Sequence, residues 1–131
     1  MNAPATPDQQ QTRAVCLLDD DLSAIRATSR LLESVGWEVA SFTDPLTFLD
    51  HAKTHQPPVV VLDIRMPVMN GLEVQRELRS IAPSTRVVIL TSMDDPSVRA
   101  RALSAGASAF LLKVVDGEEL LAGIENAVAR S

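Results

Sequence analysis

The sequence lacks an excess of positive charge, a second cysteine and any long apolar run. Its 131 residues carry a formal net charge of −5, which argues against a broad nucleic-acid-binding surface on this chain. The single cysteine, Cys16, cannot form an internal disulfide, and its apolar neighbours favour a buried side chain over a reactive thiol. No apolar run approaches the length of about 18 residues that suggests a membrane span. We therefore expect a cytoplasmic protein with no membrane segment.

The first twelve residues contain neither the basic segment nor the apolar segment of a signal peptide. We predict that residues 1–12 form a disordered tail. The remaining residues, 13–131, are predicted to form one domain, because a chain of this size buries most of its apolar surface in a single core.

Short apolar segments alternate with segments of helical spacing along the chain. The predicted strands are residues 14–18, 37–42, 59–63, 86–91 and 107–112. Apolar residues at helical spacing predict the buried faces of three helices: Leu22, Ile25, Leu32 and Val35; Leu72, Leu78 and Ile81; Leu120, Leu121, Ile124 and Val128. Gly36 and Gly106 lie where helix C-terminal caps belong, and Pro83 follows the helix predicted from Leu72, Leu78 and Ile81.

The central apolar segments are apolar on consecutive residues, which indicates burial on both faces of a parallel sheet covered by helices. The predicted fold class is therefore α/β, a doubly wound five-stranded sheet. In such sheets ligands bind outside the carboxyl ends of the strands, so the residues that follow each strand are the candidate site residues. They are Asp19, Asp20 and Asp21, then Asp63, then Thr91 and Ser92, and finally Lys113.

The chemistry of these residues favours phosphoryl transfer. Several acids in one crevice repel each other, and a bound cation removes that conflict. Only oxygen ligands are available, so the metal should be hard, and Mg²⁺ is the natural choice. Asp63 would be the nucleophile, while Lys113 and Thr91 would contact phosphoryl oxygens.

Each residue also has a simpler interpretation. The acids from Asp19 to Asp21 could cap the following helix, Thr91 could be an ordinary strand-end hydroxyl, and Lys113 could be a solvated surface charge. Their joint occurrence at four strand ends favours a common site. His51 and His55 lie on or after the helix expected between the strands at 37–42 and 59–63, and we interpret both as solvated.

Together these residues resemble the receiver domain of bacterial two-component response regulators. The resemblance runs from about Ala14 to Val128 and rests on the acid pair, on LDIRMPVMNG around Asp63, and on Thr91 and Lys113. It implies a flavodoxin-like sheet in the order 2-1-3-4-5. It also implies a signalling switch that accepts a phosphoryl group from a sensor histidine kinase, as in a phosphorelay, and that catalyses only its own phosphorylation and dephosphorylation.

The resemblance further assigns roles to single residues. Asp20, Asp63 and the backbone carbonyl of Arg65 would bind Mg²⁺ directly, and Asp19 would act largely through water. Phosphorylation would draw Thr91 inward and let Phe110 turn inward behind it, although Phe110 could equally be a permanently buried ring. The flanking residues Arg65 and Ser92 would tune the lifetime of the aspartyl phosphate.

One position departs from the family pattern. Val114 follows Lys113 where the family usually has a proline after a cis peptide bond. A cis bond before a non-proline residue costs about 2.5–4 kcal/mol, so we expect a trans bond and an unusual turn that could displace Lys113. It would also leave Val114 and Val115 exposed on the face of the fourth helix, fifth strand and fifth helix, which many receivers use to dimerise.

Two other functions compete with the phosphorylation switch. The Val114 departure is compatible with a phosphorylation-independent interaction module, a degenerate receiver whose acids are vestigial. A phosphohydrolase with Asp63 as nucleophile would usually carry a second acid two residues later, where this chain has Arg65. The family association favours either the receiver part of a transcriptional regulator or a stand-alone receiver, with no direct nucleic-acid binding by this domain.

Overall fold

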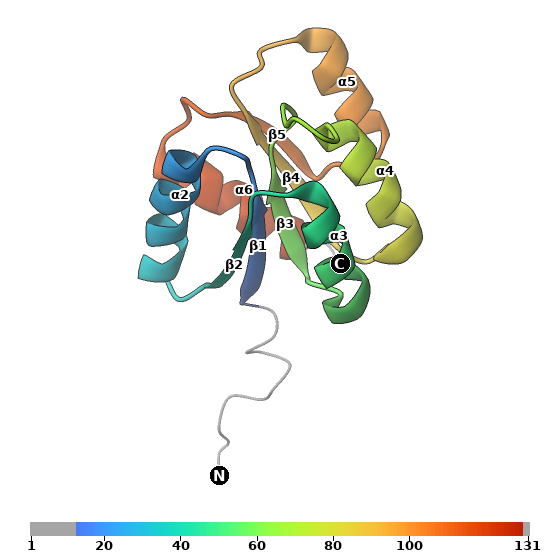
Figure 1. Ribbon diagram of the computed structural model, residues 1–131. Helices are drawn as coiled ribbons and strands as arrows, with labels where there is room; N and C mark the ends of the chain where they lie inside the picture. Colours follow the sequence, from blue (N-terminus) through green and yellow to red (C-terminus); the bar gives the residue numbers. More distant parts are fainter. Residues whose placement is uncertain (1–12, 130–131) are drawn as a thin grey trace.

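The computed structural model describes residues 13–129, and these form one parallel sheet covered by helices on both faces (Figure 1). The strands are β1 (Ala14–Leu18), β2 (Glu38–Phe42), β3 (Val59–Leu62), β4 (Arg86–Thr91) and β5 (Ala109–Leu112). The helices are α2 (Leu22–Ser34), α3 (Pro45–His55), α4 (Gly71–Ile81), α5 (Pro96–Ser104) and α6 (Gly117–Ala129). The strand order is β2-β1-β3-β4-β5, which confirms the predicted doubly wound α/β fold. The predicted tail, residues 1–12, lies outside the described residues.

Alternate residues of the central strands point into two separate cores. In β3, Val60 and Leu62 join the core under α3, α4 and α5, whereas Val59 and Val61 join the core under α2 and α6. All four side chains of β3 are buried, as expected for a strand covered on both faces. The run of consecutive apolar residues was therefore a valid signal of a central parallel strand.

Capping side chains and two glycines define the ends of the helices. The side chains of Asp21, Asp44, Asn70 and Asp95 accept hydrogen bonds from the first-turn amides of α2, α3, α4 and α5. Gly36 and Gly106 adopt positive φ angles of 97° and 104° just after α2 and α5. Both glycines therefore lie at helix C-termini, as predicted.

The predicted apolar face of α2 is wrong at both ends. Ile25 and Leu32 are buried, but Leu22 is 55% exposed and Val35 is 45% exposed. Leu22 is the first residue of the helix and Val35 is its C-cap, so both lie at the ends of α2 and not in its buried middle. Helical spacing identified the buried side of α2 but not how far along the helix that burial extends.

Three further side chains test the sequence predictions. Cys16 is buried, as predicted, and burial raises the pKa of its thiol to about 12. The interpretation of His51 as solvated is wrong, because its ring is half-buried against Phe42 with ring centroids 4.9 Å apart. His55 is exposed, as expected.

Among residues 13–129, no helix combines the length and the apolar character that a bilayer crossing requires.

Candidate functional site

The backbone of the sheet brings the strand-end residues together. The amide of Asp63 donates to the carbonyl of Leu18 over 3.0 Å, so Asp63 extends β3 beside the end of β1. At the other side of the sheet, the amide of Lys113 donates to the carbonyl of Thr91 over 2.8 Å. Consequently the candidate residues that follow β1, β3, β4 and β5 all lie at the same edge of the sheet.

Three carboxylates converge at this edge. Oxygen atoms of Asp19, Asp20 and Asp63 all lie within 4.8 Å of one another. Asp19 and Asp63 are buried, with 8% and 5% of their surface exposed, while Asp20 is exposed. The structure thus places the three acids close together, as the sequence predicted.

Lys113 bridges the two buried acids. Its Nζ lies 2.8 Å from Oδ2 of Asp19 and 3.2 Å from Oδ2 of Asp63. Burial raises the pKa of Asp19, although hydrogen bonds from Lys113 and Asp21 oppose this effect. Burial alone would lower the pKa of Lys113, but the hydrogen bond to Asp19 and the charges of both acids outweigh it and raise that pKa. The lysine therefore remains a cation and offsets part of the negative charge.

Backbone amides hold the second oxygen of each buried acid. The Ile64 amide donates to Oδ1 of Asp63 over 2.7 Å, and the Asp21 amide donates to Oδ1 of Asp19 over 3.0 Å. In both carboxylates one oxygen is thus bound by the backbone and the other by Lys113. This arrangement fixes the orientation of both carboxylates without any other side chain.

The segment after Asp63 is shaped by a close backbone approach. The Gly71 amide donates to the carbonyl of Ile64 over 2.8 Å, and a Cβ at Gly71 would lie 2.3 Å from the carbonyl oxygen of Asp63. Asn70 caps α4 in a reciprocal pair with Glu73. The Asn-Gly end of LDIRMPVMNG is therefore required to start α4 directly against the backbone of Asp63.

The predicted switch residues occupy different environments. Thr91 is fully buried, and its Oγ1 accepts a hydrogen bond from the amide of Met93 over 3.2 Å. Phe110 is half-buried and packs at the margin of the core under α3, α4 and α5. The role of Phe110 in a switch stays a prediction.

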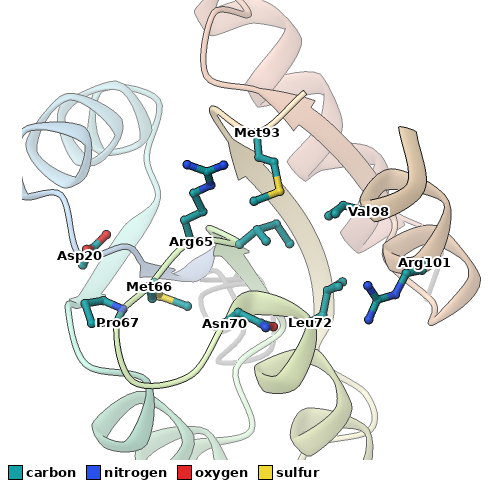
Figure 2. Close-up of a pocket in the computed structure, with 10 residues that line it drawn as sticks. Asp20, Arg65, Met66, Pro67, Asn70, Leu72, Met93, Val98 and Arg101 are labelled. Carbon is teal, nitrogen blue, oxygen red and sulfur yellow. The ribbon is translucent and has the colours of Figure 1, made fainter. Parts of the chain in front are cut away.

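A cavity of about 470 Å³ opens beside the acids, between the segment after β3 and helix α5 (Figure 2). Asp20, Arg65, Met93 and Arg101 are among the residues that line it, and Figure 2 shows these side chains around the cavity. Ser92 does not line this cavity, whereas its neighbour Met93 does. The sequence analysis did not single out Met93 or Arg101, because only the fold brings them beside the strand-end acids.

The turn after β5 accommodates Val114 without displacing the lysine. All peptide bonds among the described residues are trans, which confirms the expected trans bond at Lys113–Val114. The Val115 amide donates to the carbonyl of Leu112 over 3.0 Å and closes the turn. Val114 is 89% exposed, but Val115 packs against the core under α2 and α6, so the prediction that both valines are exposed is wrong for Val115.

The acids fit a small, hard cation. Mg²⁺ binds oxygen ligands at about 2.0–2.1 Å and so holds them about 3–4 Å apart, close to the separations allowed by the cluster. The exposed Asp20 and the buried Asp63 offer carboxylate oxygens to such an ion, and water and phosphoryl oxygens would fill the remaining positions. When bound, the ion would neutralise charge that develops on a transferred phosphoryl group.

Comparison with known proteins identifies the family. The model of the response regulator receiver domain matches residues 15–125. The chain belongs to this family. Its relatives include the tetrathionate response regulatory protein TtrR of Salmonella typhimurium, which is 39% identical over 115 residues that cover 88% of this chain and 56% of TtrR. This receiver chain spans about half the length of such relatives.

Solved structures agree with this assignment. A DNA-binding response regulator of the LuxR family from Staphylococcus aureus is 30% identical and superposes with a TM-score of 0.81, covering 88% of this chain and 98% of that chain. A CheY-like receiver domain protein from Methanospirillum hungatei has a TM-score of 0.84 over 89% of this chain and 94% of that chain. At 24% identity, the second likeness concerns the fold alone. This receiver domain is therefore a two-component signalling module related to transcriptional regulators.

Proposed function

We propose that this receiver domain is a phosphorylation-dependent switch with Asp63 as the phosphoacceptor. The observation that carries the proposal is the pairing of a buried, backbone-anchored Asp63 carboxylate with Lys113 Nζ at 3.2 Å, next to Asp19 and Asp20. In the reaction the phosphorus–nitrogen bond of a kinase phosphohistidine breaks and a phosphorus–oxygen bond to Asp63 forms. Lys113 then pairs with a phosphoryl oxygen, and the imidazole departs.

The proposed metal set is Mg²⁺ bound by Asp20, Asp63 and the carbonyl of Arg65, with Asp19 acting through water. In this proposal the two hydrogen bonds of Asp19, from Lys113 and from the Asp21 amide, would hold its carboxylate beside a metal-bound water. The domain would act as an enzyme only upon itself, catalysing its own phosphorylation and dephosphorylation.

In the proposed response to phosphorylation, Thr91 moves and the packing of Phe110 changes. Since Thr91 Oγ1 accepts from Met93, the hydroxyl proton of Thr91 is left to be donated to a phosphoryl oxygen. Such a bond would pull the segment after β4 towards Asp63 and change the packing of Phe110 and α5. Arg65, Ser92 and Met93 would tune the lifetime of the phosphoryl group by limiting access of water.

The proposed partners are a sensor histidine kinase in the cytoplasm and a second receiver through the face of α5, β5 and α6. The net charge of −5 supports a domain that does not itself bind nucleic acid. Relatives twice as long support an output through an attached domain, as in a transcriptional regulator, although a stand-alone receiver has the same site. With Lys113 in contact with both acids, no observation favours the degenerate interaction module.

The testing experiment is intact-mass spectrometry after incubation with acetyl phosphate, with Mg²⁺ and with a chelator. The expected result is a Mg²⁺-dependent gain of one phosphoryl mass that Asp63→Asn abolishes. Asp50→Asn is the matched control, because Asp50 is an exposed acid on α3. A mass gain that persists in Asp63→Asn would overturn the acceptor assignment, and no gain in the parent would favour the interaction module.

A further inference from the structure

The two histidines of the chain form a stacked pair on α3. His51 and His55 are four residues apart, and their rings lie parallel within 10° with centroids 4.1 Å apart. Two histidines at this spacing project from the same face of a helix, the arrangement that binds zinc in several metal-binding helices. The pair lies on α3, outside the cluster of Asp19, Asp20 and Asp63.

The hydrogen bond of His55 determines which nitrogen can bind a metal. Its Nδ1 lies 3.1 Å from the backbone carbonyl of His51. A carbonyl oxygen only accepts hydrogen bonds, so Nδ1 carries the proton and Nε2 of the neutral ring keeps its lone pair. Histidine ligands in metal sites are oriented in the same way, with the second ring nitrogen donating to a carbonyl or carboxylate.

His51 is held in place by Phe42 and favours its neutral form. The Phe42 and His51 rings are tilted by 49°, with centroids 4.9 Å apart. Burial, and secondarily the charge of His55, lowers the pKa of His51, so its ring is neutral near pH 7. Neither ring nitrogen of His51 hydrogen-bonds to a residue within 13–129, so both are available to a ligand.

Glu38 lines the same cavity as the two histidines. Glu38 begins β2, and it shares a sheet face with Phe42 because the two residues are four apart in the strand. Glu38, His51 and His55 all line a cavity of about 900 Å³ along β2 and α3. The exposed Glu38 side chain forms no ion pair with any described residue, so it can turn towards the rings.

We propose that His51 and His55, completed by Glu38, form a binding site for a divalent transition metal of the Zn²⁺ or Ni²⁺ type. Two imidazole nitrogens and one carboxylate oxygen suit borderline cations, whereas Mg²⁺ prefers all-oxygen sites. Water would complete the coordination. Because the ligands join α3 to the edge strand β2, a bound ion would fasten the helix to the sheet independently of Asp63.

Proton NMR of the imidazole rings provides the test, since the chain contributes signals from only two histidines. Protein freed of metal by a chelator and then returned to excess Mg²⁺ is titrated with Zn²⁺, so that Mg²⁺ fills the acidic site. Both histidines should shift or broaden together. His55→Gln should weaken the affinity at least about tenfold, because changes even in groups behind the ligands cost about 10–100-fold.

Two variants keep this test decisive. Lys53→Gln changes an exposed residue of the same helix between the histidines and should bind Zn²⁺ like the parent. Asp63→Asn should also retain the histidine response, which separates this site from the proposed phosphorylation site. Equal Zn²⁺ affinity in parent and His55→Gln, or histidine signals that Zn²⁺ leaves unchanged, would overturn the proposal.

Discussion

A Cβ atom on Gly71 would lie 2.3 Å from the carbonyl oxygen of Asp63. The same atom would lie 2.8 Å from the Cα of Ile64, so the first turn of α4 rests directly on the backbone that carries the proposed phosphoacceptor. Both contacts are with main-chain atoms, which cannot rotate away as a side chain could. A glycine is therefore required here for close approach rather than for an unusual φ angle.

Gly71→Ala should lower the free energy of unfolding by about 1–3 kcal/mol, the usual cost of forcing extra atoms into a packed site. It should also slow phosphorylation, since the segment after Asp63 must shift. Chemical denaturation and intact mass would measure the two effects. Gly123→Ala is the matched control, because its new Cβ would meet side-chain atoms and no main chain: the flexible Leu111 at 3.2 Å and the Cβ of Ala109 at 3.9 Å. Equal stability of Gly71→Ala and the parent would contradict the close approach.

Lys113→Met should reduce the rate of phosphorylation by acetyl phosphate by about 10²–10³-fold, the usual effect of removing one preorganised donor at a developing charge. The reason is that Lys113 Nζ, within 3.2 Å of Asp63, is placed to pair with a phosphoryl oxygen. Samples quenched at successive times and analysed by intact mass would give the rate of phosphorylation. Lys53→Met, at an exposed position of α3, serves as the control. A rate unchanged in Lys113→Met would remove the lysine from the mechanism.

Gln75 should tolerate an apolar replacement but not a charged one. Its side chain is buried, its Nε2 donates to the carbonyl of Ala102 over 2.9 Å, and its Oε1 accepts no hydrogen bond from any residue within 13–129. The Ala102 carbonyl also accepts from the Ala107 amide, so it stays satisfied when Gln75 is lost. We expect Gln75→Met to change the free energy of unfolding by less than about 1 kcal/mol.

Gln75→Glu should instead destabilise the protein by about 3–5 kcal/mol at neutral pH, because it buries a charge without a partner. Its deficit should shrink as the pH falls and the carboxyl group becomes protonated. Urea unfolding of both variants at two pH values would measure these changes. A loss of several kcal/mol in Gln75→Met would show instead that the hydrogen bond to the Ala102 carbonyl dominates.

Arg13 should stabilise the fold through packing more than through its ion pair. Its guanidinium lies 4.5 Å from the ring centroid of Trp37, donates to the carbonyl of Val35 over 2.7 Å and pairs with Glu125 over 3.0 Å. The ion pair is partly exposed and so is worth little, whereas the ring contact alone contributes about 0.5–1 kcal/mol. Arg13→Ala should cost about 1–2 kcal/mol in thermal or urea unfolding and Glu125→Gln less than about 0.5 kcal/mol. Equal losses of unfolding free energy in Arg13→Ala and Glu125→Gln would show that packing is not the larger contribution.

Cys16 should be inert towards thiol reagents in the folded protein. Burial raises the pKa of its thiol from 9.0 to about 12, so thiolate is scarce at about pH 8 and the sulfur is also shielded. Because the folded pKa is the higher one, the thiol's stabilising contribution is complete below about pH 9 and is lost as the pH rises towards 12. Reaction with a disulfide reagent, with and without denaturant, checks this, and fast labelling of folded protein would contradict it.

Much of the fold was readable from local patterns. Consecutive apolar residues predicted the buried strands, and their boundaries differ from the structure by no more than two residues, as at β5, which begins at Ala109 rather than at residue 107. The strand-end acids and Lys113 were predicted to converge, and the structure places Lys113 against both Asp19 and Asp63. Buried parallel strands and their loops have strong local signals, because burial restricts which residues can occupy them.

Other features depended on contacts that no local pattern contains. Leu22 and Val35 fit the helical spacing but are exposed at the two ends of α2, and Met93 rather than Ser92 lines the cavity beside Arg65. The contact between the tilted rings of His51 and Phe42 requires α3 to pack against the edge strand β2, which the positions of two histidines in the sequence do not reveal.

The sequence by itself determined the α/β class, the receiver family and the identity of the candidate acids, since these follow from burial patterns and from a motif that is continuous in the chain. Only the tertiary structure decided which oxygen of Asp63 meets Lys113, that Val114 leaves the lysine in place, and that Gly71 touches the Asp63 backbone. Asp63 and Lys113 lie 50 positions apart in the sequence, so their contact depends on strand order and register. Such distances are set by the packing of the whole sheet and not by any one segment.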